Sequence, residues 1–106
     1  MDATIVLTTL PVGADAAALA RTLVDERLAA CVNLLPVMQS IYRWQGTVLQ
    51  EDERQLVIKT WRDRLPALED RLKSLHPYEV PELLVLEAAG GSSAYLEWLQ
   101  AETRQR

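Results

Sequence analysis

Four side chains that could take part in binding or proton transfer lie within one short stretch, residues 75–82, which reads Leu-His-Pro-Tyr-Glu-Val-Pro-Glu. An imidazole, a phenol and two carboxylates occur there, and His76 is the only histidine of the chain. Pro77 and Pro81 each fix their own φ and push the preceding residue away from the α region. We therefore expect a stiff connector that holds these groups in a narrow range of orientations, as a binding site or a subunit interface requires.

Metal binding is the less favoured of two interpretations of His76, with the single cysteine, Cys31, as the second candidate ligand. Imidazole and thiolate are ligands that copper and zinc ions prefer. The two residues are 45 positions apart and show no zinc-site spacing. Cys31 is otherwise a buried thiol that packs as a small hydrophobe, and His76 is otherwise a loop histidine that hydrogen-bonds to backbone.

Lysine and aromatic residues of the predicted strands also have two interpretations. Lys59 follows an apolar run and either directs its ammonium into a pocket between chains or extends along the strand into solvent. The aromatic residues Tyr42, Trp44 and Trp61 are interpreted as core or interface residues in preference to ligand-stacking ones.

The acidic residues give no evidence for catalysis. Glu79 and Glu82 could form an acid/base pair, but no nucleophile is visible beside them, so we predict that the protein is not an enzyme. Residues 51–53, Glu-Asp-Glu, could hold a hard cation. We interpret them as a solvated acidic turn, because nothing in the sequence fixes their geometry.

The elements that must position these groups alternate between strand and helix. Apolar and β-branched patterns predict strands over 4–10, 31–35, 37–44, 47–61 and 83–86. Helical spacing predicts one helix capped by Asp15 that runs to about Leu28, one capped by Asp63 that ends before His76, and one capped by Ser92 or Ser93. The last helix is expected to bury Tyr95, Leu96, Trp98 and Leu99.

This order, β-α-β-β-α-β with an added C-terminal helix, predicts an α+β protein with a ferredoxin-like sandwich. Right-handed crossovers leave a slot between the first two strands, which the return of the hairpin fills. With 106 residues and no linker, the chain is expected to form one domain over 1–106. The hairpin of 37–44 and 47–61 is long, bent and larger than the sheet can cover, so we predict an oligomer built by sheet extension.

Composition narrows the class of partner. The net charge is −4 and the sequence pI is near 4.9, whereas nucleic-acid binding depends on clustered Lys and Arg, so no nucleic-acid partner is expected. The apolar runs are too short to span a bilayer, and the sequence begins without a secretory pattern. We therefore expect a cytoplasmic protein that does not bind membranes and whose partners are small ligands, cations or other protein chains.

Five blocks of the chain together resemble the CutA family of divalent-cation tolerance proteins. They are 26–34 (Glu-Arg-Leu-Ala-Ala-Cys-Val-Asn-Leu), 41–46 (Ile-Tyr-Arg-Trp-Gln-Gly), 57–60 (Val-Ile-Lys-Thr), 75–82 and 95–99 (Tyr-Leu-Glu-Trp-Leu). One block alone is a weak signal, but their joint order and spacing are specific. The resemblance implies a ferredoxin-like subunit in a tight homotrimer, similar to the PII signalling proteins, and a link to copper tolerance and copper binding.

The metal ligands predicted for this chain are His76 and Cys31, and only His76 matches the copper site that the resemblance implies. The copper site proposed for some members also uses a cysteine near the end of the first strand and a second histidine just before the motif. Thr8 and Leu75 occupy these positions here. A single imidazole binds Cu(II) more weakly than a chelating set does, so we expect weak copper binding.

Two functions stay open from the sequence. The first is a trimeric cytoplasmic divalent-cation tolerance protein that requires no cofactor and binds Cu(II) or another divalent cation weakly or indirectly. The alternative is a PII-like trimeric signalling protein that binds a small anionic metabolite in a cleft between subunits. The residues assigned to this ligand cleft are Trp44, Lys59, Tyr78 and Glu79, next to His76. An enzyme in the same cleft, or a connector that serves only as an interface, is a further alternative.

Overall fold

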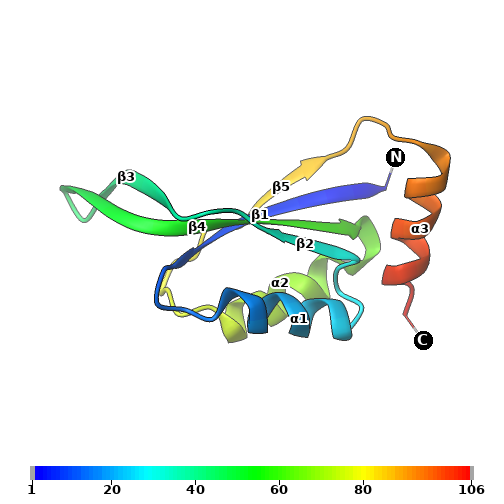
Figure 1. Ribbon diagram of the computed structural model, residues 1–106, viewed down its shortest axis with the longest axis horizontal. Helices are drawn as coiled ribbons and strands as arrows, with labels where there is room; N and C mark the ends of the chain where they lie inside the picture. The colour runs from blue at the N-terminus through cyan, green and yellow to red at the C-terminus, as the bar shows by residue number, and fades with distance from the viewer. Residues whose placement is uncertain (1, 106) are drawn as a thin grey trace.

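The chain forms one antiparallel sheet with helices packed against it (Figure 1). The computed structural model describes residues 2–105. Their strands are β1 (Ala3–Pro11), β2 (Cys31–Leu34), β3 (Met38–Trp44), β4 (Thr47–Trp61) and β5 (Leu84–Glu87). Their helices are α1 (Ala16–Asp25), the 3-10 turn η1 (Arg62–Arg64), α2 (Leu65–Leu75) and α3 (Ser93–Thr103).

The strand order is β2-β4-β1-β5, with β3 paired to the first half of β4. α1 and α2 lie beneath one face of the sheet, and α3 stands at the end where β1 begins (Figure 1). β4 occupies the slot between β1 and β2, as a right-handed βαβ connection with a returning hairpin requires. The predicted ferredoxin-like α+β fold with an added C-terminal helix is confirmed.

The β3–β4 hairpin reaches far beyond the rest of the sheet (Figure 1). Its two-residue turn is Gln45-Gly46, and both residues have positive φ, 48° and 81°. Positive φ at both positions gives a turn whose twist matches that of the two strands. The predicted turn is therefore confirmed, and it ends a two-stranded arm that no other strand of the described chain covers.

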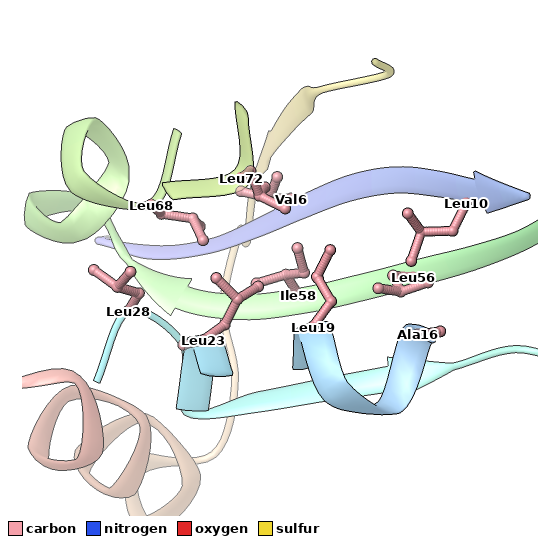
Figure 2. Packing of buried hydrophobic residues seen from close by; sticks show 11 residues of the cluster. Val6, Leu10, Ala16, Leu19, Leu23, Leu28, Leu56, Ile58, Leu68 and Leu72 are labelled. Atoms are coloured by element: carbon pink, nitrogen blue, oxygen red, sulfur yellow. The ribbon is translucent and has the colours of Figure 1, made fainter. Parts of the chain in front are cut away.

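The core lies between the sheet and the two helices beneath it (Figure 2). Alternate residues of the strands face the helices, and residues at helical spacing on α1 and α2 face the strands. The buried side chains include Val6, Leu10, Leu56 and Ile58 from the sheet, Leu19 and Leu23 from α1, and Leu68 and Leu72 from α2. α1 and α2 therefore cover only one face of the sheet (Figure 1).

α1 begins as predicted but ends earlier. The Asp15 side chain accepts a hydrogen bond from the Ala18 backbone N–H, which confirms the predicted N-cap. The helix stops at Asp25 instead of Leu28, because Arg27 adopts a φ of 60° and the Leu28 N–H turns back to the Leu23 carbonyl at 2.9 Å. This is a Schellman ending with arginine in place of glycine. Leu28 still reaches the core, from the loop rather than from the helix.

α2 starts differently from the prediction. Asp63 lies inside η1, and no side chain caps the helix at Arg64. Pro66 occupies the first turn, where its missing N–H has no cost. The helix ends at Leu75 as predicted, because the residue before Pro77 must be extended, and His76 has a ψ of 135°.

β5 and α3 expose apolar side chains that were predicted to lie in the interior of the subunit. β5 was expected to be buried, yet Leu84, Val85 and Leu86 are each about half exposed. On α3, Ser92 is the N-cap and Leu99 is buried, but Tyr95 and Trp98 are exposed. The apolar pattern thus predicts the strand and the helix, but the subunit itself does not bury the apolar side chains of these two elements.

Thr8 and Thr60 give a matched test of buried hydroxyl groups. Both are fully buried strand residues, but Thr60 Oγ1 donates to the Leu28 carbonyl at 2.7 Å, whereas Thr8 Oγ1 has no partner within residues 2–105. We expect Thr8→Val to raise the free energy of unfolding by about 1 kcal/mol and Thr60→Val to lower it by about 1–2 kcal/mol. Urea unfolding of both variants measures this. Equal effects of the two substitutions would contradict the assignment.

Candidate functional site

His76 anchors the connector to the sheet. The imidazole is buried, at 9% exposure. Its Nδ1 accepts the Tyr78 backbone N–H at 3.1 Å, so Nε2 carries the proton and donates to the Thr9 carbonyl at 2.7 Å. Both ring nitrogens are therefore used in holding residues 76–78 against the end of β1.

Tyr78 forms a second attachment, to the hairpin. Its phenol donates a hydrogen bond to Glu53 Oε2 at 2.5 Å, and Glu53 is a buried carboxylate of β4 with 5% exposure. Burial raises the pKa of Tyr78, and the bond to Glu53 raises it further, because both disfavour a phenolate. The Tyr78 and His76 rings also lie 5.0 Å apart, so the two attachments form one packed unit.

Gln55 holds the far end of the connector. Its side-chain amide donates to the Glu82 carboxylate at 2.8 Å and to the Thr8 carbonyl at 2.9 Å. Glu82 is thereby tied to the middle of β4. The connector is fixed at both ends, as the prolines predict.

A cleft of about 770 Å³ lies between the connector and one face of the hairpin. Side chains alternate between the two faces of a strand, so even-numbered residues of β3 and odd-numbered residues of β4 point to the same side. The floor of the cleft consists of Met38, Ser40, Tyr42 and Trp44 from β3 and Leu49, Glu51, Glu53 and Gln55 from β4. Residues 77–82 form the opposite wall.

The charge of this cleft is negative. Four glutamates line it, Glu51, Glu53, Glu79 and Glu82, and none of its lining residues within 2–105 is Lys, Arg or His. The Glu51 carboxylate beside Tyr42 raises the pKa of the Tyr42 phenol, because it disfavours a phenolate. The cleft can therefore attract a cation, while an anion would be repelled.

A family model described as CutA1 divalent ion tolerance protein matches residues 4–102, nearly the whole chain. The chain belongs to the CutA1 family. The resemblance found in the sequence is thereby confirmed. A divalent-cation tolerance protein CutA from Thermus thermophilus is 48% identical over 99 residues, which cover 93% of this chain and 96% of that protein. The chloroplastic protein CutA of Arabidopsis thaliana is 45% identical over 86 residues, 81% of this chain and 47% of its own.

Solved CutA structures share the fold. The Thermus thermophilus divalent cation tolerance protein superposes with a TM-score of 0.92 at 47% identity, over 96% of this chain and 99% of that one. A structure described as the PII-like protein CutA from Nostoc has a TM-score of 0.88 at 38% identity, over 95% of this chain and 97% of its own. The family is described by tolerance of divalent ions, and that description names no reaction.

Three of the four residues predicted for the CutA ligand cleft lie together. Trp44, Tyr78 and Glu79 all line the cleft between hairpin and connector. Lys59 does not line it. Lys59 lies farther along β4, between Ile5 of β1 and Cys31 of β2, on the sheet face opposite the helices.

The two predicted metal ligands are apart within one subunit. Cys31 pairs with Lys59, whereas Thr9, the partner of His76, pairs with Gln55. These positions are four residues apart along β4, about 13 Å, with β4 between them. Cys31 is a half-buried free thiol, and within residues 2–105 no group of three His, Cys, Asp or Glu side chains could hold a metal ion. Within the described part of one subunit, no set of side chains is thus placed to chelate a metal ion.

The prediction of a solvated turn at residues 51–53 is wrong. They belong to β4, not to a solvated turn. Strand alternation places Glu51 and Glu53 in the cleft and Asp52 outside its lining. The two-residue period of the strand could have separated them, but the contact between Glu53 and Tyr78, distant in sequence, could not have been read from spacing.

In the described part of the chain no helix has the length and apolar composition needed to cross a membrane.

Tyr78→Phe is expected to change the response of this protein to alkaline pH. The folded-state pKa of Tyr78 lies above the ordinary value near 10, so the folded protein keeps a proton that the unfolded chain releases. The resulting stabilisation is complete below about pH 10 and is lost as the pH rises through the folded pKa.

The free energy of unfolding should therefore fall less steeply above about pH 10 in Tyr78→Phe than in the wild type. Some slope should persist, because the pKa of Tyr42 is also raised. Urea unfolding across this pH range measures the slopes. The same slope in both proteins would contradict the raised pKa of Tyr78.

Proposed function

We propose that this member of the CutA1 family works as a cytoplasmic homotrimer that contributes to tolerance of divalent cations and binds Cu(II) or another divalent cation weakly. The observation that carries the proposal is the charge of the cleft, where four glutamates lie and no basic side chain of residues 2–105 is present. Such a surface concentrates cations. Relatives named for divalent-cation tolerance agree with this.

Uncovered apolar surface supports assembly into an oligomer. β5 is an edge strand with three half-exposed apolar side chains, and the hairpin exposes Ile41 to 68% and Val48 to 58%. An isolated two-stranded arm is marginally stable in water, and a long apolar strand edge favours pairing with another chain. Sheet extension between three copies would cover both surfaces.

Weak copper binding is supported by the contacts of the candidate ligands. For His76 to bind Cu(II), it must release either the Thr9 carbonyl or the Tyr78 N–H. Cys31 can add a ligand only with groups of a neighbouring subunit, because His76 of its own subunit is too distant. A free thiol is also compatible with the reducing cytoplasm.

Titration calorimetry with Cu(II) tests the proposal on wild type, His76→Ala and Cys31→Ser, with light scattering on the same samples. We expect the wild type to bind Cu(II) saturably, with an affinity weaker than micromolar. At least one variant should bind Cu(II) more weakly still while it keeps the mass of the wild type. Failure of the intact wild type to bind Cu(II), Zn(II) or Mg(II) would contradict the proposed cation binding. Tight Cu(II) binding by the wild type that is lost in His76→Ala would contradict the proposed weak binding.

A PII-like role is the second candidate function, with a small metabolite in the cleft. The volume of the cleft, about 770 Å³, suits a small molecule. The similarity to a structure described as a PII-like CutA protein agrees with this role. The absence of Lys59 from the cleft lining, however, removes the basic group that an anionic metabolite was expected to contact within one subunit.

A further inference from the structure

We infer that the cleft between the hairpin and the connector binds an organic cation, an aliphatic amine with two or more ammonium groups. This inference deepens the second candidate function by naming its ligand class, and it does not depend on metal binding. Three features of the cleft carry it: carboxylates without cationic partners, aromatic faces beside them, and a volume far larger than one ion.

The carboxylates of the cleft keep their charge uncompensated. None of the ion pairs formed within residues 2–105 involves Glu51, Glu53, Glu79 or Glu82. Their hydrogen-bond donors, the Tyr78 phenol and the Gln55 amide, are neutral. Because Glu53 is also buried, water screens its charge less than that of an exposed carboxylate.

Aromatic rings stand on both sides of the cleft. Tyr42 and Trp44 project from the same face of β3, and Tyr78 projects from the connector. The faces of such rings attract ammonium groups, and Trp attracts them most strongly. Apolar residues of the same lining, such as Met38, Leu49 and Val80, can contact the methylene groups of an amine. A hydrated metal ion would use neither kind of contact.

The positions of the carboxylates favour an extended cation over a single ion. Glu51 and Glu53 lie on β4, while Glu79 and Glu82 lie on the connector across the cleft. Within residues 2–105 no three of them converge as metal ligands would. A ligand with ammonium groups separated by methylene segments can reach carboxylates on both walls at once.

Titration calorimetry with the triamine spermidine tests the inference on the assembled wild-type protein, in a buffer that contains EDTA. We expect saturable binding with one site per chain that weakens as salt is added. Absence of binding at low salt would overturn the inference, as would binding of ATP in place of spermidine.

Two substitutions and one control separate a built site from general attraction. Trp44→Leu keeps an apolar side chain but removes the cation–π contact, and Glu79→Gln removes one charge. Each is expected to weaken spermidine binding about fivefold or more. Glu97→Gln makes the same charge change on an exposed residue of α3, outside the cleft, and should bind as wild type does. Equal weakening by Glu79→Gln and Glu97→Gln, with no effect of Trp44→Leu, would overturn the inference.

The outcome of the metal titration and the outcome of the amine titration are independent of each other. Copper binding is measured without amine, and spermidine binding is measured with metal removed. Loss of Cu(II) binding with retained spermidine binding contradicts only the proposed metal function. Loss of spermidine binding with retained Cu(II) binding contradicts only this inference.

Discussion

Leu86→Glu is expected to convert the proposed trimer into single chains. Leu86 lies on the edge strand β5, is 49% exposed, and pairs with Ile5 on the sheet face that lies opposite α1 and α2. A trimer built by sheet extension repeats each interface three times, so the substitution introduces a carboxylate into all of them. Each site loses about 2 kcal/mol of apolar burial and adds the larger cost of burying an unpaired charge.

Light scattering at micromolar concentration measures the mass of this variant. Circular dichroism should show that the single chains stay folded, since Leu86 is not part of the core between sheet and helices. Val24→Glu is the matched control, because Val24 is also exposed but lies on α1. The control should keep the mass of the wild type. Unchanged mass in Leu86→Glu would contradict an interface at β5.

His76→Ala is expected to lower the free energy of unfolding by about 2–3 kcal/mol. The substitution removes the partner of the Thr9 carbonyl and of the Tyr78 N–H and leaves a void beside the Tyr78 ring. Urea unfolding at one fixed protein concentration measures the loss, since the stability of an oligomer depends on concentration.

His76→Gln is the control for this substitution. Its amide can still donate to the Thr9 carbonyl, so part of the stability should return. Hydrogen exchange gives an independent readout: the backbone amides that follow Pro77 should exchange faster in His76→Ala than in His76→Gln. Unchanged exchange in His76→Ala would show that His76 does not anchor the connector.

The sheet and its topology could be predicted because their signals are local. Alternating apolar residues defined the strands, and the turn at Gln45-Gly46 fixed the hairpin. Once the order of elements was known, crossover handedness left one slot for β4. Helix starts and ends were less predictable. Arg27 adopts a left-handed conformation that most side chains avoid, so helical spacing alone extended α1 too far.

Apolar periodicity indicates which residues will be covered, but not which chain covers them. Leu84, Val85 and Leu86 satisfy the pattern of an inner strand and are nevertheless half exposed in one subunit. Tyr95 and Trp98 on α3 behave in the same way. All five residues were expected in the interior of the subunit, but their own chain leaves them exposed.

The candidate cleft was only partly predictable for a related reason. Residue types pointed to Trp44, Tyr78 and Glu79, which all line the cleft, because aromatic and acidic side chains near a stiff connector suggest a binding surface. Two of its four carboxylates belong to Glu51 and Glu53, whose position opposite the connector depends on the register of the hairpin. Lys59 lies on the same strand and misses the cleft, because it is several residues farther along.

The mass of the wild-type protein in solution is decisive for the proposed trimer. The proposed trimer predicts three times the mass of one chain by light scattering at micromolar concentration, with β5 and the hairpin covered by neighbouring chains. The mass of a single chain under the same conditions would contradict the proposed trimer.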